Sequence, residues 1–478
     1  MVMGDMELTC EVAVIGSGPA GYAAAFRAAD LGLDVALIDP RPKPGGVCLH
    51  EGCIPSKTGL HLAELIFDAR AAAAMGLHFA VPRIELAEVR AWKKQVIETM
   101  AAGLAHLSSR RGIQDIAGRA RFEDSTTLRI DGGEIRRIRC RQSVIATGSK
   151  PLTLPGTSFR EGGRIMDSSQ ALALADIPNS LLVVGGGYVG LELGTLYAAL
   201  GSRVQLVEAA DRLLAGIDRD LVAPLQQRLD GLFENISLQT RVAAMQEEPN
   251  GVEVQLQDET GSTGRTVFDR VLVAVGRRPN TADLGLETTG VSLDERGSIV
   301  VDDRQQTADP HIFAAGDVAG GVMLAHKATR EGRIAAEVIA GGNSLFDVRA
   351  IPAVVFTDPQ IAWCGLTEEQ AAAQQIPVAV QKFPWKFSGR AQSMGAADGL
   401  TKILVNPEDG RILGVGIVGR NAEGLIAEGV LAIEMGALAE DLALSLHPHP
   451  TLSETEAEAA EIFLGSPTHI LPKKPQPR

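Results

Sequence analysis

The sequence predicts an α/β protein in which strands and helices alternate, followed by a smaller α+β domain. Two observations lead to this prediction. A short apolar run, a glycine cluster and a stretch of helical spacing follow one another over residues 11–39, and the same order returns over residues 181–208. The chain has 478 residues, which is enough for about three domains with a core each.

The first of these units has the features of a β-α-β dinucleotide-binding fold of the Rossmann type. Residues 11–15 predict a strand, residues 22–31 a helix, and residues 35–38 a second strand that leads into Asp39. Glycines in the turn permit close approach of a pyrophosphate, and the helix N-terminus carries partial positive charge for its phosphates. The carboxylate of Asp39 is placed to accept a hydrogen bond from a ribose hydroxyl. The glycines of this turn are Gly16, Gly18 and Gly21.

The second unit repeats the pattern and predicts a second, different dinucleotide. Residues 181–184 form a strand-like run, and the strand at residues 204–207 leads into Glu208. A carboxylate at that position binds the ribose hydroxyls of NAD and repels the 2′-phosphate of NADP, so NAD is favoured. Arg203 and Arg212 are the argument for NADP, but neither occupies the strand-end position and we interpret both as surface arginines. The glycines of the second turn are Gly185, Gly187 and Gly190.

A pair of cysteines, Cys48 and Cys53, follows the first unit. Positions five apart on a regular helix differ by about 7.5 Å in axial rise, whereas a disulfide needs Cα atoms within about 4.4–6.8 Å. A bridge therefore requires a distorted segment, which Gly52 permits, and a strained bridge is readily reduced. The chain has five cysteines and no secretion signal, so a catalytic dithiol is favoured over a structural staple. Two unrelated buried thiols are the alternative.

Composition and charge restrict the partners. The net charge of −14 argues against nucleic acid and anionic membranes, and Lys473 and Lys474 lie among prolines in what we interpret as a solvated tail. Residues 181–200 are about as long as a membrane span, but three consecutive glycines and Glu192 favour a strand, a turn and a helix. The N-terminal residues lack the positive and apolar regions of a secretion signal, so a cytoplasmic location is expected.

Three further glycine turns follow strand-like apolar runs, and each either brings backbone close to a ligand or serves as an ordinary connection. These turns hold Ala146, Thr147 and Gly148 in SVIATGSKP, Gly276 in AVGRRPN, and Gly316 and Asp317 in HIFAAGDVAG. The predicted domain map has residues 1–149 as a first fold, 150–275 as an inserted second fold, 276–349 as the return to the first fold, and 350–478 as the C-terminal domain.

The C-terminal segment LHPHPTLSETEAEAAE holds a candidate general base. Prolines stiffen the loop that carries His447 and His449, and histidine is the side chain whose ordinary pKa suits proton transfer from a thiol near neutral pH. Glu454, where a helix is predicted to begin, is placed to orient one imidazole, and Thr451 and Ser453 are candidate caps. The spacing alone does not choose between the two histidines. A solvated turn and a metal-binding His-x-His pair are the alternatives, the second weakened by the lack of a further ligand cluster.

With these residues assembled, the chain resembles the flavoprotein disulfide reductases, and within that family the branch that oxidises dihydrolipoamide. The resemblance covers nearly the whole length. The motifs that carry it are GGVCLHEGCIPSK, GGGYVGLELG, AAGDVAGGVMLAHKATREG, FPWKFSGRA and HPHPTLSE. It implies FAD and NAD as cofactors, two Rossmann-like domains, a C-terminal dimerisation domain and a homodimer.

The resemblance also implies a role for each matching residue. Cys48 matches the interchange thiol and Cys53 the thiol beside the flavin, while Lys57 and Glu192 match an ion pair near the flavin. Among the histidines, the resemblance selects His449 as the base and Glu454 as its partner, a pair that in the family reaches the disulfide of the neighbouring subunit. Implied FAD-binding residues are Gly16, Gly18, Gly21, Asp39, Lys57, Ala146, Thr147, Gly148, Asp317, Met323, Leu324, Ala325 and His326. Implied NAD-binding residues are Gly185, Gly187, Gly190, Glu208 and Gly276.

The implied reaction is oxidation of protein-bound dihydrolipoamide with NAD⁺ as acceptor. The implied partners are the lipoyl domains and acyltransferase core of a 2-oxo acid dehydrogenase complex, or the H protein of the glycine cleavage system, because no lipoyl-carrying extension is expected in this chain; no metal is implied. His50 and Glu51 depart from the family pattern, and Tyr188 stands where it could shield the nicotinamide site. A glutathione-type reductase is disfavoured by Glu208, and mercuric reductase by the lack of a cysteine pair after Cys364. A flavin-bound scaffold subunit is the rival of another class.

Overall fold

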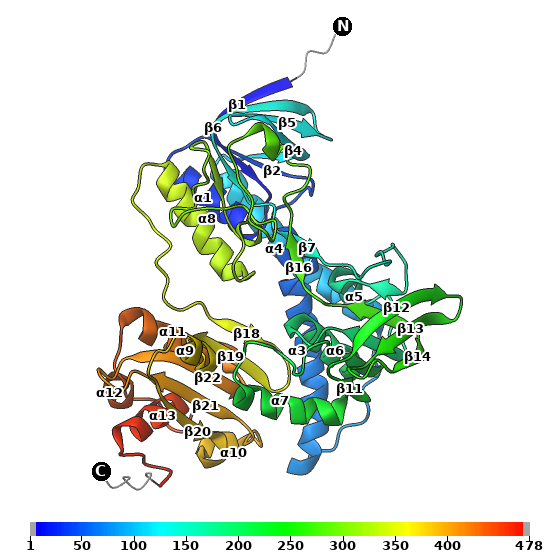
Figure 1. Cartoon of the computed structure of the whole chain (residues 1–478), viewed down its shortest axis with the longest axis vertical. Helices are drawn as coiled ribbons and strands as arrows, with labels where there is room; N and C mark the ends of the chain where they lie inside the picture. The colour runs from blue at the N-terminus through cyan, green and yellow to red at the C-terminus, as the bar shows by residue number, and fades with distance from the viewer. Residues whose placement is uncertain (1–5, 472–478) are drawn as a thin grey trace.

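The computed structural model describes residues 6–471, so Lys473 and Lys474 lie outside the described part of the chain. A seven-stranded sheet forms the first domain, in the order β3-β2-β1-β6-β5-β4 with β17 beside β6 (Figure 1). The parallel core of this sheet consists of β1, β2, β3, β6 and β17, and β5 and β4 extend it antiparallel. The strands are β1 (Met6–Ile15), β2 (Val35–Asp39), β3 (Gln114–Ala117), β4 (Arg119–Asp124), β5 (Thr127–Asp131), β6 (Ile135–Ile145) and β17 (Ile312–Ala314).

Two helices from distant parts of the sequence pack together on this sheet. They are α1 (Pro19–Asp30), which follows the first glycine turn, and α8 (Ala325–Ile339). A Cβ atom at Gly332 of α8 would lie 2.2 Å from the carbonyl oxygen of Ala20, so the contact requires glycine. The predicted return of the chain to the first fold therefore places α8 against the first glycine turn.

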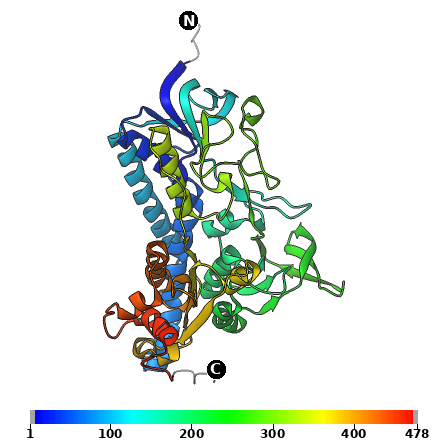
Figure 2. The same cartoon turned by 60° about the vertical axis from the view of Figure 1, so that its left-hand side comes forward.

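The helical segment that carries the cysteines runs along the length of the molecule. Its helices are α2 (Gly46–Glu51), α3 (Cys53–Ala71), η1 (Ala72–Met75) and α4 (Leu86–Arg110). Helices α3 and α4 lie side by side, as both views show (Figures 1 and 2). The first turn of α3 contacts both other domains, because Lys57 pairs with Glu192 of the second domain and lies over the Phe356 ring of the C-terminal domain. The cysteines therefore lie near the junction of all three.

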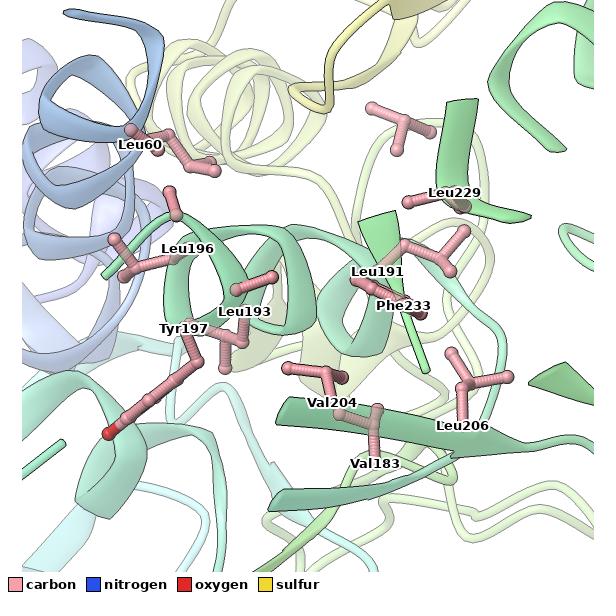
Figure 3. Close-up of a cluster of buried hydrophobic side chains, with 14 of the residues drawn as sticks. Leu60, Val183, Leu191, Leu193, Leu196, Tyr197, Val204, Leu206, Leu229 and Phe233 are labelled. Atoms are coloured by element: carbon pink, nitrogen blue, oxygen red, sulfur yellow. The ribbon is translucent and has the colours of Figure 1, made fainter. Parts of the chain in front are cut away.

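The second domain contains a parallel five-stranded sheet in the order β11-β10-β9-β15-β8, and a three-stranded antiparallel sheet in the order β12-β13-β14. Helix α6 (Tyr188–Leu200) lies between the parallel sheet and α3 (Figure 3). The parallel strands are β8 (Ile165–Met166), β9 (Ser180–Val184), β10 (Arg203–Val207), β11 (Asn235–Ser237) and β15 (Arg270–Val273). The remaining elements are α5 (Ser168–Ala173), α7 (Arg219–Leu232), β12 (Arg241–Glu248), β13 (Gly251–Gln257) and β14 (Thr263–Phe268).

The apolar stretch 181–200 is a strand, a turn and a helix, as the glycines predicted. Strand β9 ends at Val184, and every residue of α6 from Gly190 to Leu200 is buried. At Gly59 of α3 a Cβ atom would lie 2.8 Å from the Leu196 side chain, so the two helices approach closely. The length and apolarity of this stretch are therefore those of a core helix. Within residues 6–471 no helix is long and apolar enough to cross a membrane.

A two-stranded antiparallel ribbon connects the first and second domains. It pairs β7 (Ser149–Pro151) with β16 (Arg277–Pro279), where the chain leaves the first sheet and returns to it. The guanidinium of Arg277 donates to both the hydroxyl and the carbonyl of Ser149, at 2.8 and 2.7 Å. The ribbon therefore fixes the two nucleotide folds relative to each other. Two short helices, η2 (Leu286–Thr288) and η3 (Asp317–Ala319), follow it.

The C-terminal domain is an antiparallel sheet in the order β18-β19-β22-β21-β20. On β22, Val415 faces Gly429 of α11 while Gly416 faces Leu221 of α7, so helices cover both faces. The strands are β18 (Ala353–Val355), β19 (Gln360–Gly365), β20 (Ala379–Pro384), β21 (Leu400–Val405) and β22 (Ile412–Gly419). The helices are α9 (Glu368–Ala373), η4 (Trp385–Phe387), α10 (Gly389–Ser393), α11 (Ala422–Met435), α12 (Ala439–Leu444) and α13 (Glu454–Leu464). The predicted fold class, two parallel nucleotide folds and a C-terminal α+β domain, is confirmed.

Candidate active site

The two cysteines lie on either side of a helix break. Helix α2 ends at Glu51 and α3 begins at Cys53, and Gly52 between them has φ −134° and ψ −110°. A Cβ atom at Gly52 would approach the carbonyl oxygen of Val47 to 3.0 Å. The break brings the Sγ atoms of Cys48 and Cys53 to 2.7 Å as thiols, which is the distortion that a bridge between these positions requires.

The environment makes the two thiols unequal. The pKa of Cys53 is lowered, chiefly because the Cys48 thiol donates a hydrogen bond to its sulfur and also because the Lys57 ammonium is near, although burial opposes the shift. The pKa of Cys48 is raised, first by that same hydrogen bond and then by burial. Of the two thiols in the reduced pair, Cys53 therefore ionises more readily.

A partly buried ion pair lies beside the thiols and joins the three domains. The Lys57 ammonium on α3 is 2.8 Å from Oε2 of Glu192 on α6, and Glu192 is only 3% exposed. Ser56 Oγ also donates to Oε2 at 3.1 Å, and the backbone N–H of Phe356 in the C-terminal domain donates to Oε1 at 3.0 Å. Lys57 Nζ lies 4.4 Å from the centre of the Phe356 ring. Three donors from two other domains thus hold one carboxylate.

A cavity of about 1430 Å³ connects the first glycine turn to the cysteines and to Glu192. This volume exceeds the roughly 300–1,000 Å³ usual for ligand pockets, so a dinucleotide-sized group has room. Gly18 and Gly46 line it as a bare backbone surface: a Cβ on Gly46, where φ is +58°, would lie 2.5 Å from the Gly18 Cα. The hydroxyl of Ser17 faces the same region, is buried, and has no partner within residues 6–471. Both observations fit an FAD phosphate group, with the N-terminus of α1 as its electrostatic partner.

Each of the two predicted strand-end acids closes its own glycine turn. Asp39 accepts the backbone N–H groups of Ser17 and Arg41, both at 2.8 Å. Glu208 accepts those of Gly186 and Ala210, at 2.6 and 2.8 Å. The carboxylates are thereby oriented at the mouth of each turn, where a ribose is recognised in this kind of fold.

The glycine turns themselves are geometric copies. A Cβ at Gly16 would meet the Ala146 carbonyl oxygen at 2.4 Å, and one at Gly185 would meet the Ala274 carbonyl oxygen at 2.5 Å. Both glycines have positive φ, +100° and +110°. The internal duplication read from the sequence therefore extends to backbone contacts, and both turns fit a pyrophosphate.

The structure brings most of the predicted FAD residues to one cavity. Its lining includes Gly16, Gly18, Asp39, Lys57, Ala146, Thr147, Gly148, Asp317, Met323 and Ala325. Gly21 instead packs beneath the turn against the carbonyl of Gly16, because any Cβ there would collide with it. Leu324 is outside the lining, and the exposed ring of His326 makes a 2.8 Å hydrogen bond to the Pro352 carbonyl oxygen.

The predicted NAD residues form a separate group around the second turn. Tyr188 and Glu192 of α6 line the shared cavity, whereas the residues of the turn and strand end do not. Those outside the lining are Gly185, Gly187, Gly190, Glu208 and Gly276. The two arginines that favoured NADP are paired with carboxylates: Arg203 with Glu234 at 3.6 Å, and Arg212 with Glu369 through two contacts at 2.5 and 3.2 Å.

The structure separates the two histidines that the spacing left open. The His447 side chain is 9% exposed, and its ring nitrogens contact the Ser445 carbonyl oxygen at 2.9 Å and Glu428 Oε1 at 2.8 Å. The His449 side chain is 72% exposed and makes one contact, from Nδ1 to Glu454 Oε1 at 2.8 Å. Within residues 6–471, Nε2 of His449 has no hydrogen-bond partner. Only His449 therefore presents a free ring nitrogen to a substrate.

The side-chain cap predicted for the C-terminal helix is absent from the structure. Ser453 occupies the N-cap position of α13 but its side chain makes no capping hydrogen bond, and the Thr451 hydroxyl donates to the Pro448 carbonyl. The backbone N–H groups of Thr455 and Glu456 donate instead to the carbonyl oxygens of Leu452 and Ser453, at 3.1 and 3.2 Å. The Glu454 carboxylate accepts from the backbone N–H of Thr451 at 2.7 Å and contacts the His449 ring at 2.8 Å. These bonds lower the pKa of Glu454, although its partial burial opposes the shift.

Sequence reasoning missed the groups that support the site. Ser56 and Phe356 hold Glu192, and Glu428 holds His447. Ser56 lies inside the cysteine motif and could have been predicted from it, whereas Phe356 and Glu428 come from distant segments that carry no motif. The His449–Glu454 pair is not among the residues that line the cavity of its own chain.

Comparison with known proteins gives a consistent result. A family model for pyridine nucleotide-disulphide oxidoreductases matches residues 10–332, and one for the dimerisation domain of the same enzymes matches residues 351–460. Among curated relatives, dihydrolipoyl dehydrogenase of Vibrio cholerae is 43% identical over 97% of this chain and 98% of its own, and that of Geobacillus stearothermophilus is 43% identical over 99% and 100%. Among solved structures, LpdA of Mycobacterium tuberculosis is 30% identical with a TM-score of 0.87 over 95% of this chain and 99% of its own. The HOCl-induced flavoprotein disulfide reductase RclA of Escherichia coli is 28% identical with a TM-score of 0.83 over 95% and 99%.

Proposed function

The chain belongs to the pyridine nucleotide-disulphide oxidoreductase family, and from this premise we propose that it oxidises protein-bound dihydrolipoamide to lipoamide with NAD⁺ as acceptor. The observation that carries the proposal is the pair of adjacent thiols, Cys48 and Cys53, at one end of a dinucleotide-sized cavity. The full-length similarity to dihydrolipoyl dehydrogenases supports this substrate. We propose that residues 1–149 and 276–349 form the FAD-binding domain, residues 150–275 the NAD-binding domain, and residues 350–478 the dimerisation domain.

FAD and NAD are the cofactors of the family, and the chain offers a separate binding site for each. We propose that the first turn, Asp39 and the strand-end residues around Thr147 hold FAD, while the second turn and Glu208 hold NAD. When bound, FAD supplies the two-electron chemistry that connects a dithiol to a nicotinamide. Lys57 and Glu192 lie between these two proposed sites, and we propose that they orient the flavin and the nicotinamide relative to each other. Tyr188 lines the cavity near the same point, and we propose that its ring shields the nicotinamide site.

The chain's own residues carry out the thiol exchange. Nε2 of His449 takes the proton from one substrate thiol, and the resulting thiolate attacks Sγ of Cys48 in the oxidised pair. The Cys48–Cys53 bond breaks and Cys53 leaves as the thiolate, the form that its lowered pKa favours. The second substrate thiol then attacks the mixed disulfide at the substrate sulfur and Cys48 leaves, which closes the lipoamide ring. Of the two substrate protons, one ends on Cys48 and one is released.

The base and the disulfide are proposed to come from different copies of the chain. His449 is highly exposed and lies outside the cavity lining of its own chain, so it is available to a neighbour. The match to a dimerisation domain supports the homodimer. Glu454 fixes the ring through Nδ1, which leaves Nε2 for the thiol and stabilises the imidazolium that forms.

We propose that the dihydrolipoamide is presented by a lipoyl domain of a 2-oxo acid dehydrogenase complex or by the H protein of a glycine cleavage system. The names of the relatives support dihydrolipoyl oxidation and leave these two sources equal. A cytoplasmic location is proposed with it, because free thiols at a catalytic pair suit a reducing compartment.

The proposal is tested with the His449→Gln variant. General-base catalysis is typically worth about 10²- to 10⁴-fold, so oxidation of dihydrolipoamide should fall by at least the lower figure. Reduction of an artificial electron acceptor by NADH, which bypasses the thiols, should keep its wild-type rate. His106→Gln is the matched control, since His106 is exposed on α4. If both activities of His449→Gln fell together, or neither did, the assignment of the base would be wrong.

A further inference from the structure

A buried hydrogen-bond chain leads from the sheet of the C-terminal domain to the loop that carries His449. The indole Nε1–H of Trp385 donates to Thr401 Oγ1 at 2.9 Å, and Thr401 Oγ1 is 2.7 Å from Thr455 Oγ1. Thr455 Oγ1 in turn donates to the Leu452 carbonyl oxygen at 2.7 Å. The side chains of Trp385, Thr401 and Thr455 are all 0% exposed.

The direction of every bond in this chain is fixed. An indole nitrogen only donates, and a threonine hydroxyl has a single proton to give. Because Thr455 gives its proton to the Leu452 carbonyl, its oxygen must accept from Thr401, and Thr401 must accept from Trp385. Each hydroxyl therefore donates once and accepts once, in one direction, from the indole to the loop backbone.

The starting point of the chain is held rigidly. Trp385 packs closely against two glycines that lie side by side at the ends of β21 and β22: Cβ atoms at Gly399 and at Gly419 would each come within 2.3 Å of its ring. The backbone N–H of Trp385 also donates to the Gly399 carbonyl at 2.9 Å. The ring is fully buried in this close packing, which holds its Nε1–H toward Thr401 Oγ1.

The end point of the chain lies inside the catalytic loop. Leu452 is between His449 and Glu454, and its carbonyl receives both the Thr455 hydroxyl and the Thr455 backbone N–H, the latter at 3.1 Å. The side-chain cap expected at this helix start is absent, since Ser453 makes no capping bond. The Thr455 hydroxyl supplies a side-chain tie at this point instead, from within the first turn of α13.

We propose that Trp385, Thr401 and Thr455 are positioning residues that set the place of the His449–Glu454 pair by anchoring the Leu452 carbonyl to the sheet. The inference rests on the proposed role of His449 as the base. The three residues come from η4, β21 and α13, and none of them lines the cavity. They act on the rate of proton transfer through the loop, at a distance from the thiols.

The test uses shape-conserving variants of the full-length enzyme with FAD bound. Thr401→Val removes two hydrogen bonds of this chain, and an intramolecular hydrogen bond makes a modest net contribution. We expect the kcat for dihydrolipoamide to fall about 3- to 10-fold, with the KM for NAD⁺ and the NADH-dependent reduction of an artificial acceptor unchanged. Thr455→Val should behave in the same way, and Thr455→Ser, which keeps the hydroxyl, should restore the wild-type rate.

Two further measurements separate positioning from a general loss of structure. The matched control is Thr307→Val, because Thr307 is a buried threonine of the first domain that donates to the Ile312 carbonyl at 2.8 Å; it should leave the kcat for dihydrolipoamide unchanged. The emission of Trp385, taken as the difference between each protein and its Trp385→Phe counterpart, should shift in Thr401→Val and not in Thr307→Val. Equal losses of both activities in Thr401→Val, or no rescue by Thr455→Ser, would overturn the inference. If His449→Gln itself left dihydrolipoamide oxidation intact, the assignment of His449 as the base would fail instead, and a wild-type enzyme that does not oxidise dihydrolipoamide would refute the proposed function.

Discussion

Replacing Glu456 by leucine should make the protein more stable. Glu456 is in the first turn of α13 and is 0% exposed, and neither carboxylate oxygen has a hydrogen-bond partner within residues 6–471. Burial raises its pKa well above the ordinary range, and the nearby charge of Glu428 adds to the shift. Burying a polar group without a partner costs roughly 1–3 kcal/mol in proteins. We therefore expect Glu456→Leu to raise the free energy of unfolding at pH 7 by about that amount.

The pH dependence gives this prediction its sign. A carboxyl whose pKa is raised in the folded state binds its proton more tightly there, so stability falls as the pH rises above the ordinary value of about 4.3. The gain from Glu456→Leu should therefore be smallest near pH 4 and should grow toward pH 8. Urea titration across this range measures it, and Glu456→Gln is the control: it removes the charge but keeps an unpaired polar group, so it should remove the pH dependence with a smaller gain. A loss of stability at pH 7, or a gain that is the same at every pH, would refute the reasoning.

Two more predictions concern ion pairs between domains. Lys57→Met should lower the free energy of unfolding by about 2–3 kcal/mol, because it leaves the buried Glu192 carboxylate with only two neutral donors; the loss is smaller than the roughly 3–5 kcal/mol for a fully buried pair because Lys57 is partly exposed. Adding Glu192→Leu should recover part of the loss. A double-mutant cycle with strictly additive losses would contradict this prediction. Lys402, which is 1% exposed, is 2.7 Å from Asp220 and from Glu368. Burial raises the pKa of each carboxyl but hydrogen bonds from lysines outweigh it, so both pKa values are lowered and their contribution is lost as the pH falls below about 4. Lys402→Met should therefore destabilise the protein at pH 7 and flatten its acid unfolding curve, and an unchanged acid limb would count against the cluster.

The sequence was sufficient for the nucleotide folds because their turns impose local constraints. Gly16 and Gly185 have positive φ and lie against the residues that directly follow β6 and β15, where no side chain fits, so the glycine spacing carries the geometry directly. The apolar stretch that contains Glu192 was read correctly for the same reason, since consecutive glycines end a strand. Both acids, Asp39 and Glu208, lie at strand ends and close the turns that precede them.

The features that could not be predicted from the sequence depend on contacts between residues far apart in the chain. The partners of Glu192 come from residues 56 and 356, and no spacing rule connects them. His447 and His449 differ in their surroundings: Glu428 of α11 contacts Nε2 of His447, whereas Nε2 of His449 has no partner within residues 6–471. The side-chain cap of α13 was predicted from residue type alone and was wrong, because N–H groups in the first turn of the helix, those of Thr455 and Glu456, donate to backbone carbonyls instead.

The central claim is that Cys48 and Cys53 exchange a bond for two thiols during turnover, and counting thiols tests it most directly. Air-oxidised enzyme is incubated without oxygen, with or without dihydrolipoamide and without NAD⁺, then denatured, alkylated and analysed by peptide mass spectrometry. We predict that the three other cysteines are alkylated in both samples, whereas Cys48 and Cys53 are alkylated only after dihydrolipoamide. The account is contradicted if these two are already alkylated in the oxidised enzyme, or if the substrate leaves them unlabelled.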